Sequence, residues 1–363
     1  MKLRRIFSVA IFSSIALCCV VFAGAAHQDS GINEKLMAAI RDADAQAVKA
    51  SLSAGADANA KDEDGLTALM HAAMFAGADC VELLLAKGGD PNAKSKGDVT
   101  ALMLAVGDAA KVKLLLAKGA EVNAKSKQGH TALSIAAGRE GGLEVVKALL
   151  DHGAELPAIN LLGAAAYSGD IRVTQLLLER GANPNDRSNI GGAPPITEKR
   201  ASERSKGGTI LPVSPRIGLA GNSRGTPLMY AALARNTEII KLLLKKGADI
   251  NARNNVNSTA LMLAAQLGDL ATVKLLLENG AQINSRDEWE YTALMYAAAA
   301  ENNDPAVIKA LLDKGAEINV KGKDGETALK LANRKGRTEI VRLLKQAGAK
   351  EIVAVQQLSG GRL

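Results

Sequence analysis

Aromatic residues are scarce in this chain of 363 residues, at 2% of the sequence, although apolar residues of all kinds make up 47%. Small and aliphatic residues therefore supply most of the apolar content, and there is a single tryptophan. A chain of this length exceeds one compact core, so we expect several domains or a repeat array. The composition and the 35 glycines favour many short, closely packed helices separated by frequent turns.

Cysteine is also rare, with three residues in the chain. Cys18 and Cys19 lie in the N-terminal segment, so Cys80 is the one cysteine of the remaining sequence. A single cysteine excludes an internal disulfide and a thiolate zinc site, which needs several cysteines at short spacing. We expect Cys80 to be a small buried hydrophobic residue, because a redox role would need an exposed thiol with a lowered pKa.

The motifs of common enzyme classes are missing as well. The sequence contains no P-loop, no dinucleotide-binding glycine motif and no nucleophile elbow. Its four histidines form none of the pairs that bind metals; we expect His71 to pack on a helix face and His130 to lie at an exposed turn. The sequence therefore predicts no catalytic residue, no metal site and no cofactor, and a protein that is not an enzyme.

The first 26 residues have the pattern of an export signal. Three basic residues precede an uncharged apolar run at 6–22, and Ala23-Gly24-Ala25 supplies the small residues of a cleavage site. An uncleaved membrane anchor is the main alternative, because this segment could just span a bilayer. A lipoprotein signal ranks third, since the bulky Leu17 precedes Cys18. We expect a signal peptide at residues 1–26 and a periplasmic or secreted protein; the alternative is anchoring in the inner membrane, facing the periplasm.

The formal net charge of +7 comes from two short segments. The N-terminal segment and residues 187–224 contribute +3 and +5, which leaves about −1 for the rest of the chain. No general surface for nucleic acid or membrane is indicated. The segment at 187–224 is basic, rich in Pro and Gly, and without apolar periodicity, so we expect a flexible insertion. We rank its roles as a solvated linker first, an arm for an acidic partner or anionic lipid second, and a nucleic-acid contact last. Nucleic acid ranks last because the segment lacks interleaved aromatic residues for stacking.

A motif recurs about every 33 residues along the rest of the chain. The segment 67–73, Thr-Ala-Leu-Met-His-Ala-Ala, returns with variations that begin at Thr100, Thr131, Thr226, Thr259, Thr292 and Thr327. A second apolar run follows each copy and ends at a glycine, after which comes Ala-Asp-Ile-Asn or a close variant. Thr suits a helix N-cap, and Gly suits a left-handed C-terminal cap. Each copy therefore predicts a pair of helices, which must stack on further copies to bury its apolar face.

These motifs resemble the ankyrin-repeat family, whose signature joins Thr-Pro-Leu-His-x-Ala-Ala to Val-x-Leu-Leu-Leu-x-x-Gly-Ala-Asp-x-Asn. The family's Pro is kept at Pro227, and its His is replaced by Met in five copies, where we expect weaker links between neighbouring turns. The resemblance implies an all-α solenoid of about nine helix-turn-helix units with projecting turns. We place repeats 1–5 at residues 31–186, the insertion at 187–224, repeats 6–9 at 225–350 and a disordered tail at 351–363.

Function in this family lies on the variable turn tips and the adjoining faces of the first helices. Trp289 lies on such a tip beside Tyr291, and these residue types often anchor protein interfaces. Packing of Trp289 over a neighbouring turn is the open alternative. The residues that we predict to contact a partner are Trp289, Tyr291, Glu288, Val256, Asn257, Met74, Phe75, Gln266 and Leu267.

The resemblance to exported bacterial members of the family implies a non-enzymatic module that binds a partner protein in the periplasm. The alternative is a secreted effector that binds a host protein. We expect a monomer with no nucleic-acid partner and no small-molecule substrate. Membrane contact is expected only if the N-terminal segment is not cleaved.

Overall fold

The structure, a computed structural model, describes residues 31–156, 161–188, 224–301 and 304–351. The predicted signal peptide, most of the insertion at 187–224 and most of the tail at 351–363 lie outside these residues. The chain divides into two compact units. Of the described residues, unit 1 contains those up to Ala182, and unit 2 contains 183–188 and 224–351.

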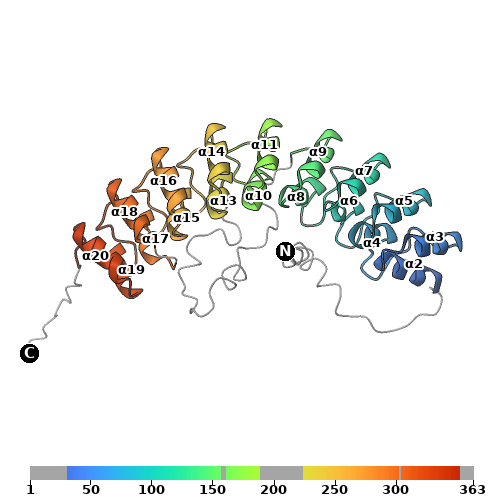
Figure 1. The fold of residues 1–363 in the computed structure, drawn as a ribbon, viewed down its shortest axis with the longest axis horizontal. Coiled ribbons are helices and arrows are strands. Elements are labelled where there is room, and N and C mark those ends of the chain that lie inside the picture. Colours follow the sequence, from blue (N-terminus) through green and yellow to red (C-terminus); the bar gives the residue numbers. More distant parts are fainter. Residues whose placement is uncertain (1–30, 157–160, 189–223, 302–303, 352–363) are drawn as a thin grey trace, which may run out of the picture. The chain divides into compact units, whose positions relative to one another are not determined.

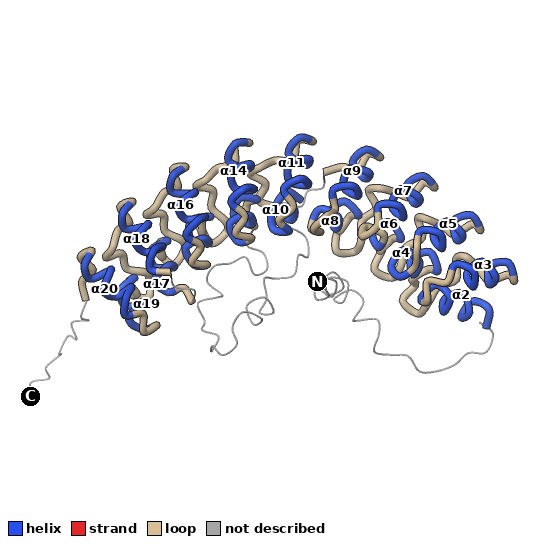
Figure 2. The backbone as a smooth tube through the Cα atoms, in the orientation of Figure 1, coloured by secondary structure: helices blue, strands red, loops and turns tan. Residues whose placement is uncertain are grey.

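Unit 1 is a stack of helix pairs, in which a short first helix turns back into a second helix (Figure 1). The pairs are α2 (Gly31–Arg41) with α3 (Ala45–Ser53), α4 (Ala68–Phe75) with α5 (Ala78–Ala86), α6 (Ala101–Leu104) with α7 (Ala109–Ala117), α8 (Ala132–Ala137) with α9 (Leu143–Asp151), and α10 (Leu161–Ser168) with α11 (Ile171–Glu179). First helices pack on first helices and second helices on second helices, so each unit has two layers (Figure 2).

Unit 2 repeats this arrangement with four further pairs. They are α13 (Pro227–Leu233) with α14 (Thr237–Lys245), α15 (Ala260–Gln266) with α16 (Leu270–Glu278), α17 (Ala293–Ala299) with α18 (Pro305–Asp313), and α19 (Ala328–Arg334) with α20 (Thr338–Gln346). Within the described residues there are no strands, apart from an isolated bridge between Lys61 and Thr67. The predicted all-α repeat solenoid is confirmed.

The expected helix caps are present in every repeat that carries the motif. The hydroxyl of Thr259 accepts a hydrogen bond from the backbone N–H of Met262 at 3.4 Å, and six other repeat threonines cap their helices in the same way. After the second helix the chain turns through a glycine in the left-handed region, as at Gly247 with φ of +85°. These two signals in the sequence therefore set where the helices begin and end.

The core of each unit consists of aliphatic side chains between stacked pairs. Leu243 and Leu276 of the second helices are fully buried, as are Ala264 and Ala265 of a first helix, where small side chains let the helices approach closely. Cys80 is fully buried in α5, as the sequence predicts. Its contribution is therefore to packing.

A buried cation interrupts this core. Lys111 of α7 occupies the repeat position that Cys80 holds in α5, and it is 7% exposed. Its ammonium group donates hydrogen bonds to the backbone carbonyls of Ala73 at 3.1 Å and Ala72 at 3.4 Å, near the end of α4. Burial lowers the pKa of Lys111 from its ordinary value, and Asp108 and Cys80 partly oppose that effect.

Asparagine side chains join successive turns within each unit. The amide of Asn59 donates to the carbonyl of Gly88 at 2.9 Å, and its oxygen accepts from the backbone N–H of Asp90 at 2.8 Å. The same pair of bonds is made by Asn92, Asn123, Asn185, Asn251, Asn284 and Asn319. Asn185 reaches Gly247 and Asp249, so this ladder joins the chain on the two sides of residues 189–223 within unit 2.

Candidate functional site

The turn tips between repeats are short loops held by their own first residue. Asn254 opens one tip of unit 2, and its side-chain oxygen accepts from the backbone N–H groups of Val256 at 3.1 Å and Ser258 at 2.8 Å. Such side-chain-to-backbone bonds fix a loop without regular secondary structure. The tips therefore project as defined shapes rather than as loose connections.

Neighbouring tips also bond to each other. In unit 2 the backbone N–H of Glu288 donates to the carbonyl of Val256 at 3.0 Å, and the N–H of Lys323 donates to the carbonyl of Trp289 at 3.0 Å. The tip at 287–291, which we call the Trp289 tip, thus lies between two others and is bonded to both. Of the predicted contact residues, the structure brings together Glu288, Trp289, Val256 and Asn257 on these tips.

A buried carboxylate organises the Trp289 tip. Asp287 is 3% exposed, and one of its oxygens accepts from the backbone N–H groups of Trp289 at 2.9 Å and Tyr291 at 2.8 Å. The other oxygen accepts from the hydroxyl of Tyr296, which projects from α17. Burial raises the pKa of Asp287 above its ordinary value, although these hydrogen bonds act in the opposite direction. The backbone of Trp289 is therefore tied to the helix layer through the buried side chain of Asp287.

Tyr291 corrects one of the sequence-based predictions. We expected it to be an exposed partner contact, but it is 2% exposed and its ring packs 5.6 Å from that of Tyr296. Its hydroxyl donates to a carboxylate oxygen of Asp324 on the next tip, at 2.7 Å. The ring fits there because residue 322 is glycine: a Cβ at Gly322 would lie 2.5 Å from the ring. Tyr291 thus supports the tip from inside and does not reach a partner.

Glu290 holds an unfavourable backbone conformation on the same tip. Its φ is +62°, in the left-handed region, whereas the equivalent positions of the other described tips carry Gly, Asn or Asp. Glutamate is not favoured there, at a cost of about 1–2 kcal/mol. Its carboxylate pairs with Arg286 at 3.3 Å, and Arg286 also pairs with Glu317 at 3.3 Å. Strained backbone conformations of this kind cluster at functional sites.

Trp289 itself is half-buried. No Lys or Arg of the described residues stacks on its ring, and its backbone groups are the only part of it with hydrogen bonds there. Its indole therefore remains partly available at the surface. A half-buried side chain agrees with both of its expected roles, partner contact and packing over a neighbouring turn.

Gln266 and Leu267 lie at the far end of α15 from its tip, about 10 Å along a seven-residue helix. Both are half-buried, and the carbonyl of Leu267 accepts from Arg235 at 2.7 Å. They form a separate part of the first-helix face and are not part of the Trp289 tip.

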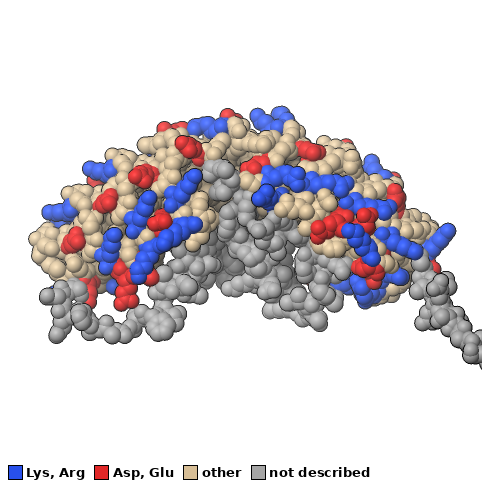
Figure 3. Space-filling view, turned by 180° about the vertical axis from the view of Figure 1, so that it is seen from behind, with Lys and Arg blue, Asp and Glu red and all other residues tan. Residues whose placement is uncertain are grey.

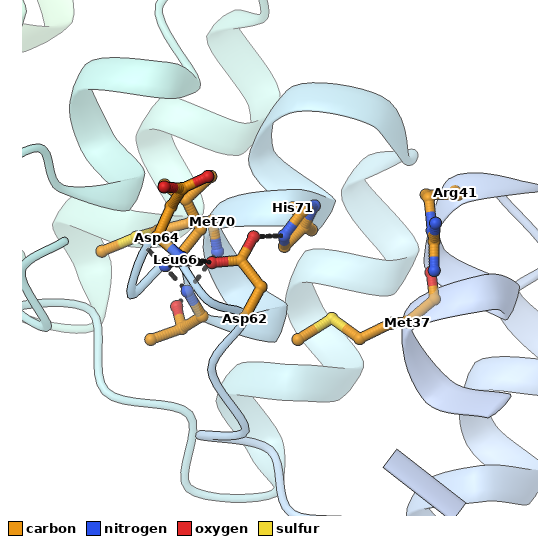
Figure 4. Close-up of polar contacts among 8 residues, drawn as sticks. Met37, Arg41, Asp62, Asp64, Leu66, Met70 and His71 are labelled. Atoms are coloured by element: carbon orange, nitrogen blue, oxygen red, sulfur yellow. Dashed lines mark hydrogen bonds and ion pairs between the residues drawn. The ribbon is translucent and has the colours of Figure 1, made fainter. Parts of the chain in front are cut away.

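Met74 and Phe75 belong to unit 1. Phe75 is 52% exposed at the end of α4, Met74 is half-buried, and the Phe75 ring stacks on His71 with centroids 6.1 Å apart. His71 lies on the helix face, as predicted, and its Nε2 is 2.8 Å from a carboxylate oxygen of Asp62 (Figure 4). The other oxygen of Asp62 accepts from the N–H groups of Asp64 and Leu66, which closes the first tip.

The carboxylates that hold two of these tips were not predicted from the sequence. An Asp at the first tip position is followed nine residues later by a side chain that bonds to it, as in Asp62 with His71 and Asp287 with Tyr296. At the other described tips, Ser, Asn or Gly is followed at that spacing by an aliphatic residue. This paired change between repeats was the signal that could have revealed the buried carboxylates. His130 is a further correction: it is half-buried rather than exposed, and burial lowers its pKa.

The described residues offer little else that could carry chemistry. They contain no group of three or more His, Cys, Asp or Glu side chains able to hold a metal ion. None of the described helices combines the length and apolar character needed to cross a membrane. An open hollow beside the Trp289 tip is lined by Arg253, Gln282, Asn284, Ser285, Arg286 and Glu290. Basic and acidic side chains are interspersed on the face of each unit drawn in Figure 3.

Stacked helix pairs with fixed, projecting tips define a repeat scaffold of the kind that binds other proteins. The family model for ankyrin repeats (3 copies) matches residues 36–126, 75–160, 107–188, 210–287 and 261–354. The chain belongs to the ankyrin-repeat family. Ankyrin repeats are generally protein–protein interaction modules, and the family is typically a non-enzymatic scaffold.

Two relatives share part of the repeat region. The ankyrin repeat and SAM domain-containing protein 6 of Rattus norvegicus is 34% identical over 106 residues, which is 29% of this chain and 11% of the relative. The Mus musculus protein of that name is 33% identical over 106 residues, which is again 29% of this chain and 11% of the relative. The chain therefore matches about a tenth of the length of these relatives.

Proposed function

We propose that this chain is a non-enzymatic module that binds a partner protein in the periplasm, with the Trp289 tip as the main contact. The observation that carries the proposal is the combination of a partly exposed tryptophan with a buried Asp287–Tyr296 pair beneath it. Tryptophan removes a large area from water on binding and is enriched among residues that dominate interfaces. Because the tip is already ordered, little conformational entropy is lost when a partner binds.

The strained Glu290 supports the same location. A tip can close with Gly, Asn or Asp at this position, as the other described tips do, so folding alone does not require glutamate. Glu290 follows Trp289 in the sequence, and its carboxylate forms an ion pair with Arg286. Two charged side chains therefore belong to the same tip as the tryptophan. We therefore assign Glu288, Trp289 and Glu290, with Val256 and Asn257 of the adjoining tip, to the contact surface.

The location in the cell rests on the N-terminal pattern of a basic start, an apolar run and a small-residue cleavage site. Export through this signal would leave a mature chain that begins near His27. Intact-mass measurement of the chain from the periplasmic and the membrane fractions tests this. A mass that retains residues 1–26 would instead support a membrane anchor.

In-cell crosslinking followed by mass spectrometry tests the binding site. Wild type, Trp289→Ala and Phe75→Ala would be compared, because Phe75 is an exposed aromatic residue of unit 1 and serves as a matched control. We expect one reproducible partner that is captured by wild type and Phe75→Ala and lost in Trp289→Ala. Capture that depends on Phe75 and not on Trp289 would overturn the assignment.

A Glu290→Gly variant separates binding from folding at this tip. Removing the strain should leave the stability unchanged or raise it by up to about 1 kcal/mol. Partner capture should nevertheless weaken, because the charged group beside Trp289 is lost. Full capture by this variant would show that Glu290 has no part in the contact.

A further inference from the structure

Two adjacent tips of unit 1 carry a cluster of lysines that neither the fold nor the Trp289 tip uses. Lys94 and Lys96 flank Ser95 on the tip before α6, and Lys125 and Lys127 flank Ser126 on the tip before α8. All four side chains are exposed, and none forms an ion pair with another described residue. We call these two tips, residues 94–98 and 125–129, the lysine tips.

The shape of the lysine tips is fixed by hydrogen bonds to their backbone. The hydroxyl of Ser95 accepts from the backbone N–H of Val99 at 3.2 Å, and the hydroxyl of Ser126 accepts from that of His130 at 3.2 Å. The backbone N–H of Lys127 then donates to the carbonyl of Gly97 at 3.0 Å. The two tips consequently lie side by side and present their lysines at equivalent positions.

Serine at the first tip position also changes the charge. The equivalent residues 61–65 and 286–290 each have a net charge of −2, and Asp62 and Asp287 stand there at the position of the serines. The lysine tips have net charges of +1 and +2, with Asp98 as their one acidic residue. Positive charge is thus concentrated on two neighbouring tips in the middle of unit 1.

We propose that the lysine tips are a second partner-binding surface, which takes a short acidic segment of a protein with its carboxylates against Lys94, Lys96, Lys125 and Lys127. Nucleic acid fits less well, because these tips carry no aromatic side chains on which bases could stack. An extended anionic membrane surface also fits less well, because the neighbouring tip at 61–65, whose Asp64 carbonyl accepts from the backbone N–H of Lys96 at 3.1 Å, has a net charge of −2. This surface is independent of the Trp289 tip.

Fluorescence anisotropy of a labelled octaglutamate peptide with the purified chain tests the proposal. The first variant changes Lys94, Lys96, Lys125 and Lys127 to Gln. The matched control changes Lys87, Lys113, Lys118 and Lys147 to Gln, because these are exposed lysines on or just after second helices of the same unit. Circular dichroism would establish that both variants keep the helix content of wild type.

We expect the first variant to lose about tenfold or more in affinity, because each exposed ion pair contributes modestly and four act together. The control should lose less than about twofold, and binding to wild type should weaken as salt is added. Trp289→Ala should bind octaglutamate as wild type does. Equal losses in the two lysine variants would overturn the proposal, since net charge alone would then explain binding.

Two further probes decide the class of ligand. Octathymidylate and phosphatidylserine vesicles would be measured with the same variants. Weaker binding of both than of octaglutamate supports the proposal. Tighter binding of either through the same four lysines, or no binding of octaglutamate by wild type, would overturn it.

Discussion

Replacing Tyr296 with Phe removes one hydroxyl from the interior and leaves the buried carboxylate of Asp287 without one of its donors. A hydrogen bond to a charged group contributes about 1.5–3 kcal/mol, and its loss at a buried site leaves the acceptor unsatisfied. We therefore expect Tyr296→Phe to lower the free energy of unfolding by about 1.5–3 kcal/mol at neutral pH.

The effect should depend on pH, with a sign that follows from the pKa of Asp287. Its folded-state pKa is raised above the ordinary 3.8, so the folded chain binds this proton more tightly than the unfolded chain. Stability consequently falls as pH rises from 3.8 to the folded pKa. Loss of the Tyr296 hydroxyl raises that pKa further, because its hydrogen bond stabilises the charged form. The destabilisation by Tyr296→Phe should therefore be smaller below pH 3.8 and should grow as pH rises through the folded-state pKa of Asp287.

Tyr230→Phe is the matched control, because Tyr230 holds the equivalent position in α13. Its hydroxyl bonds to the backbone of Gly225, and burial raises its pKa to about 12, so its removal should cost the same at acid and neutral pH. Urea unfolding followed by circular dichroism at both pH values provides the comparison. A loss in Tyr296→Phe that does not change with pH, or no loss at all, would refute the role given to the Asp287 carboxylate.

Three further substitutions test the packing of the repeats. Leu276→Ala in α16 should destabilise by ~2–5 kcal/mol, because the side chain is fully buried, and an unchanged denaturation midpoint would count against the repeat alignment. Lys111→Met should be neutral or stabilising at pH 7. Wild type should gain stability relative to that variant as pH approaches 10.5, since the lowered pKa lets the folded chain release the proton first; melting temperatures that stay parallel would contradict this. Asn92→Asp should cost about 1 kcal/mol in urea unfolding, because aspartate can still accept from Glu121 but cannot donate to Gly119.

The sequence predicted the parts of the fold that depend on local signals. The threonine caps, the glycine turns and the burial of Cys80 follow from residue types that recur at a constant spacing, and the structure confirms them. The role of the turn asparagines was not predicted, because their bonds reach residues about 30 positions away. A repeat pattern shows that such a residue recurs without showing what it bonds to.

The candidate site was harder to predict because it depends on contacts between repeats. Tyr291 was expected at the surface since it lies on a tip. It is buried instead, because Gly322 leaves room for its ring and the Asp324 carboxylate accepts a hydrogen bond from its hydroxyl. The burial of Lys111 was not predicted either, because it depends on the packing of α7 against the end of α4, where its ammonium group finds the carbonyl of Ala73. In a repeat protein the departures from the shared pattern, such as the pairing of Asp287 with Tyr296, are the informative positions.

Amide hydrogen exchange of the chain, with and without the partner captured by crosslinking, tests the central claim most directly. Binding at the Trp289 tip predicts slower exchange of the amides at 287–291 and of the adjoining tips at 254–258 and 322–326. Slower exchange confined to unit 1, with these three tips unchanged, would contradict the assignment of the Trp289 tip as the main contact.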